Sequence, residues 1–302
     1  MKKAVGIDIG GTKTAIAAVT SEGRIVSELS LPTNSAAGFA DGTERIVRSV
    51  HTVVTRAGWP CEDLAGIGIG CAGPVDPVQG SIHNPYTLPG WEDAHIVRAL
   101  AEHLGVPVWL ENDADAALLG ECCFGAGQGC DPVVMLTFGT GVGGGILAQG
   151  RIVRGARGQH PELGHLSVVT NGAECYCGTR GCLESIASGT AIGARGEAAG
   201  WIDARAVFAA ARAGETSAAA IVADAVNAVC TAVWTIAHTV LPQRLLLGGG
   251  IMDEHYDLFA GSATAALARA TQFDPKSVTV AKAALGNRAG LAGAASLALR
   301  AG

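Results

Sequence analysis

The sequence VGIDIGGTKTAIAAVT, residues 5–20, decides the fold. It reads as a buried strand over residues 5–9, a glycine turn at Gly10-Gly11-Thr12, and a second strand from Thr14. The same design recurs in VVMLTFGTGVGGGILA, residues 133–148, where a glycine run over residues 139–145 separates two apolar strands. Two strand–glycine turn–strand units, well apart in the chain, predict two related α/β lobes that face one another.

Hydrophobic patterning supplies the remaining elements and the division of the chain. Strands are expected over residues 25–29, 67–70, 107–110 and 245–247, and helices over residues 43–56, 94–104, 204–212, 217–238 and 288–299. We place the lobe boundary near Leu110-Glu111 because no low-complexity linker marks another position. This predicts a small N-terminal lobe formed by residues 1–111 together with about residues 288–302, and a large C-terminal lobe formed by residues 112–287.

Composition indicates a globular protein that handles small molecules. Hydrophobic residues make up 49% of the 302 residues and charged residues 16%, and the net charge of -6 offers no electrostatic footprint for nucleic acid. Asp8 interrupts the first apolar run too early for a signal peptide, and we expect no membrane-spanning stretch. The nine cysteines show no disulfide framework. A reducing cytoplasm is therefore the expected location.

The first glycine turn has the chemistry of a phosphate site. Gly10 and Gly11 let the backbone approach an anion, the Thr12 hydroxyl can donate a hydrogen bond, and Lys13 adds positive charge. Asp8, at the end of the preceding strand, could hold the water shell of Mg²⁺. An ordinary hairpin turn is the alternative interpretation. The spacing is not that of a P-loop, and a strand follows the turn where a dinucleotide fingerprint has a helix.

Two later glycine turns extend this interpretation to a whole nucleotide. Gly139-Thr140-Gly141 repeats the first design, so the two turns could clamp successive phosphates of one nucleotide. Gly248-Gly249-Gly250 follows a buried strand, and Gly249 and Gly250 could let an adenosine ring lie close to the backbone. A glycine turn that only packs a helix would look the same.

An Asn-Asp pair opens the helix that follows the strand at residues 107–110. Asn112 and Asp113 can simply cap that helix. The functional alternative is that Asp113 is a general base and Asn112 holds a neighbouring hydroxyl, because phosphoryl transfer to an alcohol needs a carboxylate beside that hydroxyl.

One imidazole and three thiols follow the pattern H-x9-C-x-C-x4-C, in which His165, Cys175, Cys177 and Cys182 form the ligand set of a structural zinc site. A catalytic zinc normally keeps one position open, whereas four protein ligands are available here. Two carboxylates, Glu162 and Glu184, flank the set. We infer that the metal folds a loop so that these carboxylates face a polar ligand; scattered reduced thiols are the alternative.

Taken together, these segments resemble the ROK family of sugar kinases within the actin-like ATPase superfamily. ELGH, residues 162–165, resembles the E-x-G-H signature, and CYCGTRGCLE, residues 175–184, resembles the C-x-C-G-x-x-G-C-x-E signature. The two glycine turns resemble the family's two phosphate motifs. The resemblance implies a two-lobed actin-like ATPase fold, related to ribonuclease H, with ATP and Mg²⁺ in a cleft between the lobes and a zinc-binding loop.

The resemblance also implies roles for individual residues. Asp113 would take the proton from the sugar 6-hydroxyl during transfer of the ATP γ-phosphate. His165, Cys175, Cys177 and Cys182 would bind Zn²⁺. The sugar hydroxyls would meet Asn112, Asp113, Glu162, His165 and Glu184, and Gly73 and Asn84 fall where the family lines the sugar pocket. A homodimer is implied as well, since dimers are common in the family.

Departures from the family pattern leave the substrate open. Family glucokinases often have Gly directly before the Glu of E-x-G-H, whereas His160-Pro161 precedes Glu162 here, as in the family's fructokinases. The segment 84–91 is longer than the usual Asn-Leu-x-Gly-Trp.

We predict an ATP-dependent hexose 6-kinase, most simply a glucokinase. Three alternatives are kept: an N-acetylmannosamine or N-acetylglucosamine kinase, a fructokinase or broad hexokinase, and a non-catalytic sugar-sensing repressor. A repressor's helix-turn-helix segment would precede the first strand, which here begins at Ala4. Polyphosphate in place of ATP stays open.

Overall fold

The computed structural model describes residues 2–301. Its contacts divide the chain into two units. The first unit comprises the residues up to Gly129, Ile152–His160, and the residues from Asn287 onward; the second comprises Cys130–Arg151 and Pro161–Gly286. The chain therefore leaves and re-enters each unit, and each unit is described by itself.

A five-stranded sheet forms the centre of the first unit. Its strands are β1 (Lys3–Ile9), β2 (Lys13–Thr20), β3 (Ile25–Pro32), β4 (Leu64–Cys71) and β7 (Val108–Asn112), in the order β3-β2-β1-β4-β7. Strands β1, β4 and β7 are parallel, whereas β1–β2 and β2–β3 are antiparallel. The register aligns Ile9 with Cys71 and Cys71 with Asn112. The carboxyl ends of three strands thus share one edge of the sheet.

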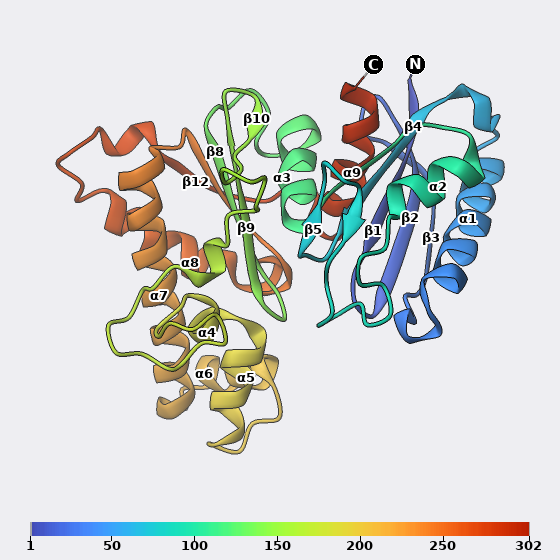
Figure 1. Ribbon diagram of the computed structural model, residues 1–302. Coiled ribbons are helices and arrows are strands. Elements are labelled where there is room, and N and C mark those ends of the chain that lie inside the picture. The colour runs from blue at the N-terminus through green and yellow to red at the C-terminus, as the bar shows by residue number, and fades with distance from the viewer. Residues whose placement is uncertain (1, 302) are drawn as a thin grey trace. The chain divides into compact units, whose positions relative to one another are not determined.

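Helices cover both faces of this sheet (Figure 1). Helices α1 (Phe39–Arg56) and α2 (Ile96–Leu104) pack on one face, and α3 (Asp113–Phe124) and α9 (Ala289–Arg300) lie on the other. The alternation of β1 explains the two layers, because Ile7 and Ile9 join the core under α1 while Ala4 joins that of α9. Each fully buried isoleucine side chain contributes about 1.5–3 kcal/mol.

Helix α9 lies unusually close to the sheet and to α3 because glycines face it. A Cβ on Gly68 would lie 1.7 Å from the carbonyl oxygen of Ala294, and a Cβ on Gly293 would lie 1.6 Å from that of Ala116. This packing ties α3 to the first unit. The contact division consequently runs to Gly129, beyond the boundary expected at residue 111, and the first unit also includes residues 152–160.

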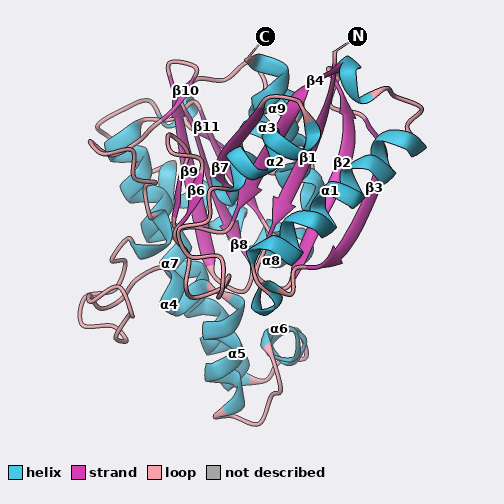
Figure 2. Ribbon diagram, turned by 45° about the vertical axis from the view of Figure 1, so that its right-hand side comes forward, coloured by secondary structure: helices cyan, strands magenta, loops and turns pink. Residues whose placement is uncertain are grey.

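A second five-stranded sheet forms the centre of the second unit (Figure 2). Its strands are β8 (Val133–Phe138), β9 (Val142–Ala148), β10 (Arg151–Ile152), β11 (Arg244–Gly248) and β12 (Thr279–Lys282), in the order β10-β9-β8-β11-β12. The strand order matches that of the first sheet, with an antiparallel β8–β9 pair followed by parallel β11 and β12. The predicted internal repeat is therefore confirmed as a shared topology. The glycine run was expected to be one turn over 139–145, but β9 begins at Val142, so only residues 139–141 turn.

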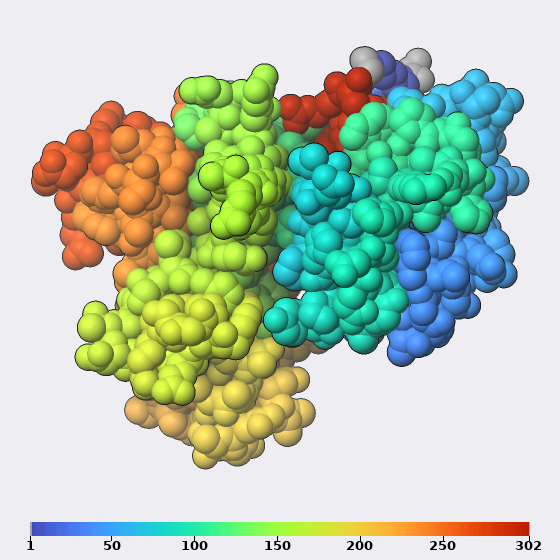
Figure 3. Space-filling model, viewed as in Figure 1, coloured from blue at the N-terminus to red at the C-terminus, as the bar shows by residue number. Residues whose placement is uncertain are grey.

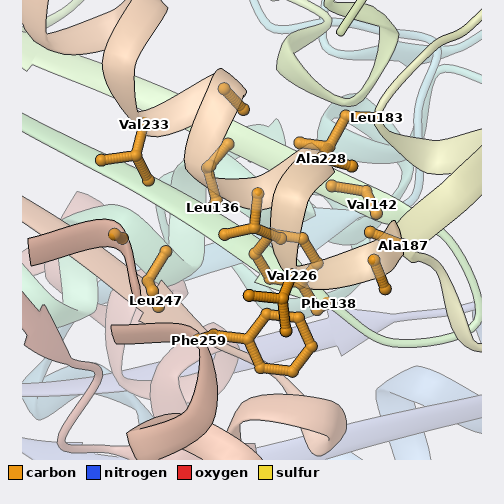
Figure 4. Close-up of a cluster of buried hydrophobic side chains, with 14 of the residues drawn as sticks. Leu136, Phe138, Val142, Leu183, Ala187, Val226, Ala228, Val233, Leu247 and Phe259 are labelled. Atoms are coloured by element: carbon orange, nitrogen blue, oxygen red, sulfur yellow. The ribbon is translucent and has the colours of Figure 1, made fainter. Parts of the chain in front are cut away.

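Helices of the second unit bury one face of its sheet. They are α4 (Glu184–Ala187), α5 (Gly189–Glu197), α6 (Ala204–Arg212), α7 (Thr216–Val240) and α8 (Gly250–Leu267). Figure 4 shows the core, where Leu136 and Phe138 of β8 and Leu247 of β11 meet Val226 of α7 and Phe259 of α8.

Helix α7 corrects one expectation from the sequence. By length and composition it could cross a membrane, although no stretch of that kind was expected. Half of its most apolar window is buried inside the unit, where Ala225, Val229 and Val233 join the core. Its apolar composition is therefore accounted for by packing within the unit.

Short elements complete the description. The small strands β5 (Val75–Asp76) and β6 (Ser81–Ile82) pair with each other, and single 3-10 turns form at η1 (Ser35–Ala37), η2 (Cys61–Asp63), η3 (Leu163–His165), η4 (Pro275–Ser277) and η5 (Gly286–Arg288). Every strand and helix expected from the sequence overlaps an observed element, with ends shifted by a few residues. The helices α4, α5 and α8 and the strands β5, β6, β10 and β12 were not expected.

Candidate active site

Two acidic side chains lie at the shared carboxyl edge of the first unit's parallel strands. Asp8 comes from the end of β1, and Asp113 follows β7 directly. Burial raises the pKa of Asp8 from its ordinary 3.8 to about 6; Asp113 adds to the rise and Lys13 opposes it. Ligands of open α/β sheets bind outside the carboxyl ends of strands, so this edge is the natural place for a site.

The first glycine turn is open to solvent next to Asp8. Gly11, Thr12 and Lys13 are exposed, and the Gly10 amide donates to the Lys13 carbonyl at 3.0 Å, which closes the turn. A Cβ on Gly11 would lie 2.9 Å from the Thr87 carbonyl oxygen. The hairpin interpretation and the phosphate interpretation both fit, since the turn is a β1–β2 hairpin whose residues Gly11, Thr12 and Lys13 are exposed.

Asn112 and Asp113 serve different purposes at the start of α3. The Asn112 side-chain oxygen accepts hydrogen bonds from the amides of Ala114 at 2.9 Å and Asp115 at 3.3 Å, so Asn112 is the helix cap. Asp113 is only half-buried. Burial raises its pKa, while the Ala114 amide and the positive charge of His160 lower it. One Asp113 oxygen also accepts a hydrogen bond from the Ala114 amide at 2.8 Å, yet burial leaves Asp113 with the raised proton affinity that suits a general base.

The structure brings one of the two less certain sugar-pocket residues to this edge. Gly73 lies against Asn112, because a Cβ on Gly73 would be 3.0 Å from the Asn112 side-chain nitrogen. Asn84 is 1% exposed, and its amide donates to Ala72 and Thr87 while its oxygen accepts from the amides of Tyr86 and Thr87. Asn84 therefore organises its own loop and presents no unused group to a ligand.

In the second unit, the turn Gly139–Gly141 is braced by the start of α5. The Gly189 amide donates to the Gly139 carbonyl at 2.8 Å, and the Thr190 hydroxyl donates to the Thr140 carbonyl at 2.8 Å. These carbonyls are thereby turned toward α5. A pocket of about 510 Å³ opens beside the turn; it is lined by Gly139, Thr140, Gly189, Thr190, Asp203, Ala204, Arg205, Phe208, Gly250, Ile251, Glu254 and His255.

The glycines after β11 divide between packing and the pocket. Gly249 has φ +89°, and a Cβ on it would lie 2.4 Å from the Phe138 carbonyl oxygen, so backbone packing requires this glycine. Gly250 begins α8, has open space where a Cβ would be, and lines the 510 Å³ pocket. The packing alternative therefore describes Gly249, whereas Gly250 remains the residue beside which a ligand could lie.

The E-x-G-H segment is fixed on β9 by its glycine. A Cβ on Gly164 would lie 2.0 Å from the Val142 carbonyl oxygen, so only glycine lets this turn approach the strand. Glu162 precedes the 3-10 turn Leu163–His165, and His165 closes it. The close approach holds Glu162 and His165 beside the strand that follows the second glycine turn.

Four potential metal ligands converge next to this segment. The ligand atoms of His165, Cys175, Cys177 and Cys182 all lie within 4.8 Å of one another. Cys175 Sγ is 3.4 Å from His165 Nδ1, and Cys177 Sγ is 3.5 Å from Cys182 Sγ. Metal–ligand bonds of about 2.0–2.3 Å in a tetrahedron put neighbouring ligands about 3.5 Å apart. The donor set and its spacing therefore fit zinc. Figure 3 shows residues 166–182, coloured yellow-green, at the surface of the second unit.

Glu184 links the metal-ligand loop to the second glycine turn. Its carboxylate accepts a hydrogen bond from the Val142 amide at 2.8 Å, and a Cβ on Gly141 would lie 2.5 Å from the same oxygen. The Tyr176 ring packs edge-on against His165, and the negative charge of Glu184 helps burial to raise the Tyr176 pKa. A second pocket of about 380 Å³ is lined by Gly141, Cys175, Tyr176 and Glu184, among others.

Comparison with known proteins identifies the family. A family model described as "ROK family" matches residues 4–301.

The chain belongs to the ROK family.

Characterised ROK relatives are similar along most of the chain. A glucokinase of Thermotoga maritima is 36% identical over 82% of this chain and 82% of its own length. An N-acetylmannosamine kinase of Citrobacter koseri is 34% identical over 97% of this chain and 98% of its own. A solved ROK family glucokinase from Streptomyces griseus, in complex with glucose and AMPPNP, has a TM-score of 0.80 and 32% identity and covers 99% of this chain and 100% of its own. The fold is therefore the two-lobed ROK variant of the actin-like ATPase fold.

Several site residues of this ROK chain had not been singled out from its sequence. Gly189 and Thr190 were detectable, because Ser188 is a helix cap directly before two small residues. Arg205 and Glu254, which line the larger pocket, carry no local pattern, since α6 and α8 bring them together only in the folded unit.

Proposed function

We propose that this chain is an ATP-dependent kinase that transfers the γ-phosphate of ATP to the 6-hydroxyl of a hexose, with glucose as its preferred sugar. The observation that carries the proposal is Asp113. In a chain of the ROK family, this carboxyl stands at the carboxyl edge of the parallel strands, directly after the helix cap Asn112, and has a raised pKa. The glucokinase relative and the solved glucokinase with glucose and AMPPNP favour glucose and ATP.

Asp113 would accept the proton of the 6-hydroxyl as the alcohol attacks the γ-phosphorus. A base works best when its pKa approaches the working pH, and burial moves Asp113 in that direction. Little covalent chemistry is needed beyond this step, because phosphoryl transfer depends mostly on positioning and charge stabilisation. Asn112 and Gly73, side by side at this edge, would contribute to the sugar pocket.

The two glycine turns would bind the phosphates of ATP. Exposed amides of Gly11 and Thr12, with Lys13, would receive one part of the triphosphate, and the turn Gly139–Gly141 another. Mg²⁺ neutralises phosphate charge when it is bound, and Asp8 is placed to hold its water shell. The 510 Å³ pocket beside Gly139 and Gly250 would take the nucleoside.

Glu162, His165 and Glu184 would bind sugar hydroxyls from the second unit. Zn²⁺ held by the one imidazole and three thiolates would fix the loop that carries these residues, without taking part in the reaction. Because the Glu184 carboxylate also accepts from Val142 beside the second phosphate turn, it would connect the sugar and nucleotide regions of this unit. No disulfide joins the nine cysteines, all of which lie within residues 2–301, and this suits a reducing cytoplasm. A homodimer stays a prediction.

A second candidate substrate is N-acetylmannosamine. The kinase for that sugar aligns with nearly the whole chain at 34% identity, only slightly below the glucokinase. A coupled ADP-release assay over glucose, mannose, fructose, allose, N-acetylmannosamine and N-acetylglucosamine separates the candidates. The proposal expects the highest kcat/KM with glucose. A preference for an N-acetylhexosamine would assign the second function, and no ADP release with any sugar would favour a non-catalytic sensor.

A further inference from the structure

Tyr176 occupies the corner of a tight turn in the metal-ligand loop. The Gly178 amide donates to the Cys175 carbonyl at 3.0 Å, and the Cys175 amide donates to the Thr179 carbonyl at 2.8 Å. Gly178 has φ +94°, a conformation that favours glycine. Tyr176 is therefore the first central residue of a closed turn, and it lies between two of the candidate metal ligands, Cys175 and Cys177.

The turn presents the Tyr176 ring at the surface of the second unit. Tyr176 is 84% exposed, but exposure alone indicates no role, because single exposed apolar side chains are common on protein surfaces. The neighbour of the ring is more informative. The ring packs against the imidazole of His165, with centroids 5.0 Å apart and planes at 88°. The turn and this contact together fix the ring beside a residue proposed to bind a sugar hydroxyl.

The same ring lines a pocket that contains a second of the proposed sugar ligands. The pocket of about 380 Å³ includes Tyr176 and Glu184 in its wall. Among the described residues that line it, Tyr176 supplies the aromatic surface, Glu184 a carboxylate, and Ser185 and Thr190 hydroxyl groups. Small-molecule sites typically combine an aromatic or apolar wall with a few polar groups that set the orientation of the ligand.

The imidazole of His165 has one nitrogen available for a ligand. Its Nδ1 lies 3.4 Å from Cys175 Sγ, within the set of candidate metal ligands. Nε2 is then the nitrogen that carries the hydrogen, and the second nitrogen of a metal-bound histidine normally donates a hydrogen bond. A sugar hydroxyl that accepts from Nε2 would lie beside Tyr176, because the tyrosine ring packs on the same imidazole.

A pyranose has two kinds of surface that need different partners. Its hydroxyls point outward and suit carboxylates and imidazole nitrogens, whereas its ring C–H groups form apolar faces that suit an aromatic ring. In the proposed function, Glu162, His165 and Glu184 bind the hydroxyls. The exposed ring of Tyr176, placed next to two of these three residues, is suited to the apolar face.

We propose that Tyr176 is a sugar-binding residue whose ring packs against the C–H face of the acceptor hexose while Glu162, His165 and Glu184 hold its hydroxyls. This inference rests on the proposed kinase function, and it names the side chain that binds the apolar part of the sugar. The ring contributes to sugar affinity and takes no part in phosphoryl transfer.

The test compares Tyr176→Ala and Tyr176→Phe with the wild type. The alanine variant should raise the KM for glucose roughly 3- to 10-fold, the size expected for one aromatic contact, with kcat within about twofold of the wild type. The phenylalanine variant keeps the ring and should stay within about twofold in both constants. Calorimetry without ATP should show the same loss of glucose affinity in the alanine variant. Ile202→Ala removes another 84% exposed side chain of the second unit; it is the matched control and should change none of these values.

Zinc content separates a sugar contact from support of the loop. Tyr176→Ala should retain wild-type zinc in elemental analysis, because the four candidate ligands are unchanged. A folded alanine variant with wild-type glucose affinity, a phenylalanine variant as weak as the alanine variant, or joint loss of zinc and glucose affinity in the alanine variant would overturn the proposal. If the wild type bound no hexose and released no ADP, the kinase function itself would fail. An active wild type with an unaffected alanine variant would overturn only the role of Tyr176.

Discussion

Replacing Asp8 by asparagine removes a carboxyl group whose ionisation the fold disfavours. Burial, and to a smaller extent Asp113, raises the pKa of Asp8 from 3.8 to about 6. The unfolded chain therefore loses this proton at lower pH than the folded chain. The cost to the folded protein is absent below about pH 4, grows as the pH rises toward 6, and is complete above that value.

The size of the effect follows from the same shift. A rise of the pKa from 3.8 to about 6 corresponds to about 3 kcal/mol of unfolding free energy. Asparagine has nearly the same shape and cannot ionise. Asp8→Asn is therefore expected to increase the free energy of unfolding by about 1–3 kcal/mol at pH 8 and by about half as much at pH 5. The lower end applies if the amide is poorly hydrogen-bonded.

Urea denaturation between pH 5 and pH 8, without Mg²⁺ or nucleotide, measures this difference. Glu44→Gln, an exposed carboxyl of α1 in the same unit, is the control and should change stability little at either pH. The Asp8→Asn variant should also lose most ATP-dependent turnover, because the group that destabilises the fold is the one proposed to hold the Mg²⁺ water shell. A variant no more stable than wild type at pH 8, or a stability gain independent of pH, would refute the reasoning.

The remaining predictions concern the second unit. Gly164→Ala should lower the free energy of unfolding by about 1–3 kcal/mol, because the new Cβ would meet the Val142 carbonyl oxygen. Gly261→Ala is the control, because open space surrounds its Cβ, and it should not lower the free energy of unfolding. Equal stability of the two variants in urea denaturation would contradict the packing argument. Cys177→Ser should lose bound zinc and glucose affinity together, measured by elemental analysis and calorimetry, and a zinc-free variant with normal glucose binding would show that the metal does not brace the sugar site.

The sequence was most informative where a local pattern has one structural outcome. The two strand–glycine turn–strand segments predicted a repeated α/β unit, and the two sheets share one strand order. The H-x9-C-x-C-x4-C spacing predicted four ligand atoms that could meet, and they lie within 4.8 Å. In both cases the residues that matter are close in sequence, so spacing alone constrains their geometry.

Prediction was weakest where a role depends on tertiary contacts. Asn84 was assigned to the sugar pocket, but all of its described hydrogen bonds organise its own loop. Glu184 was expected to face the sugar. Its carboxylate also accepts a hydrogen bond from the Val142 amide, which could not be foreseen because Val142 lies more than forty positions earlier in the chain. The boundary at residue 111 did not anticipate the packing of α3 on α9, which depends on Gly293 far along the chain. None of these contacts has a local sequence pattern.

The most direct test of the account is Asp113→Asn, measured for both turnover and sugar binding. The account predicts glucose affinity close to that of the wild type by calorimetry and a fall in kcat of roughly 10²–10⁴-fold in the ADP-release assay. A folded Asp113→Asn protein that still phosphorylates glucose at nearly the wild-type rate would contradict it.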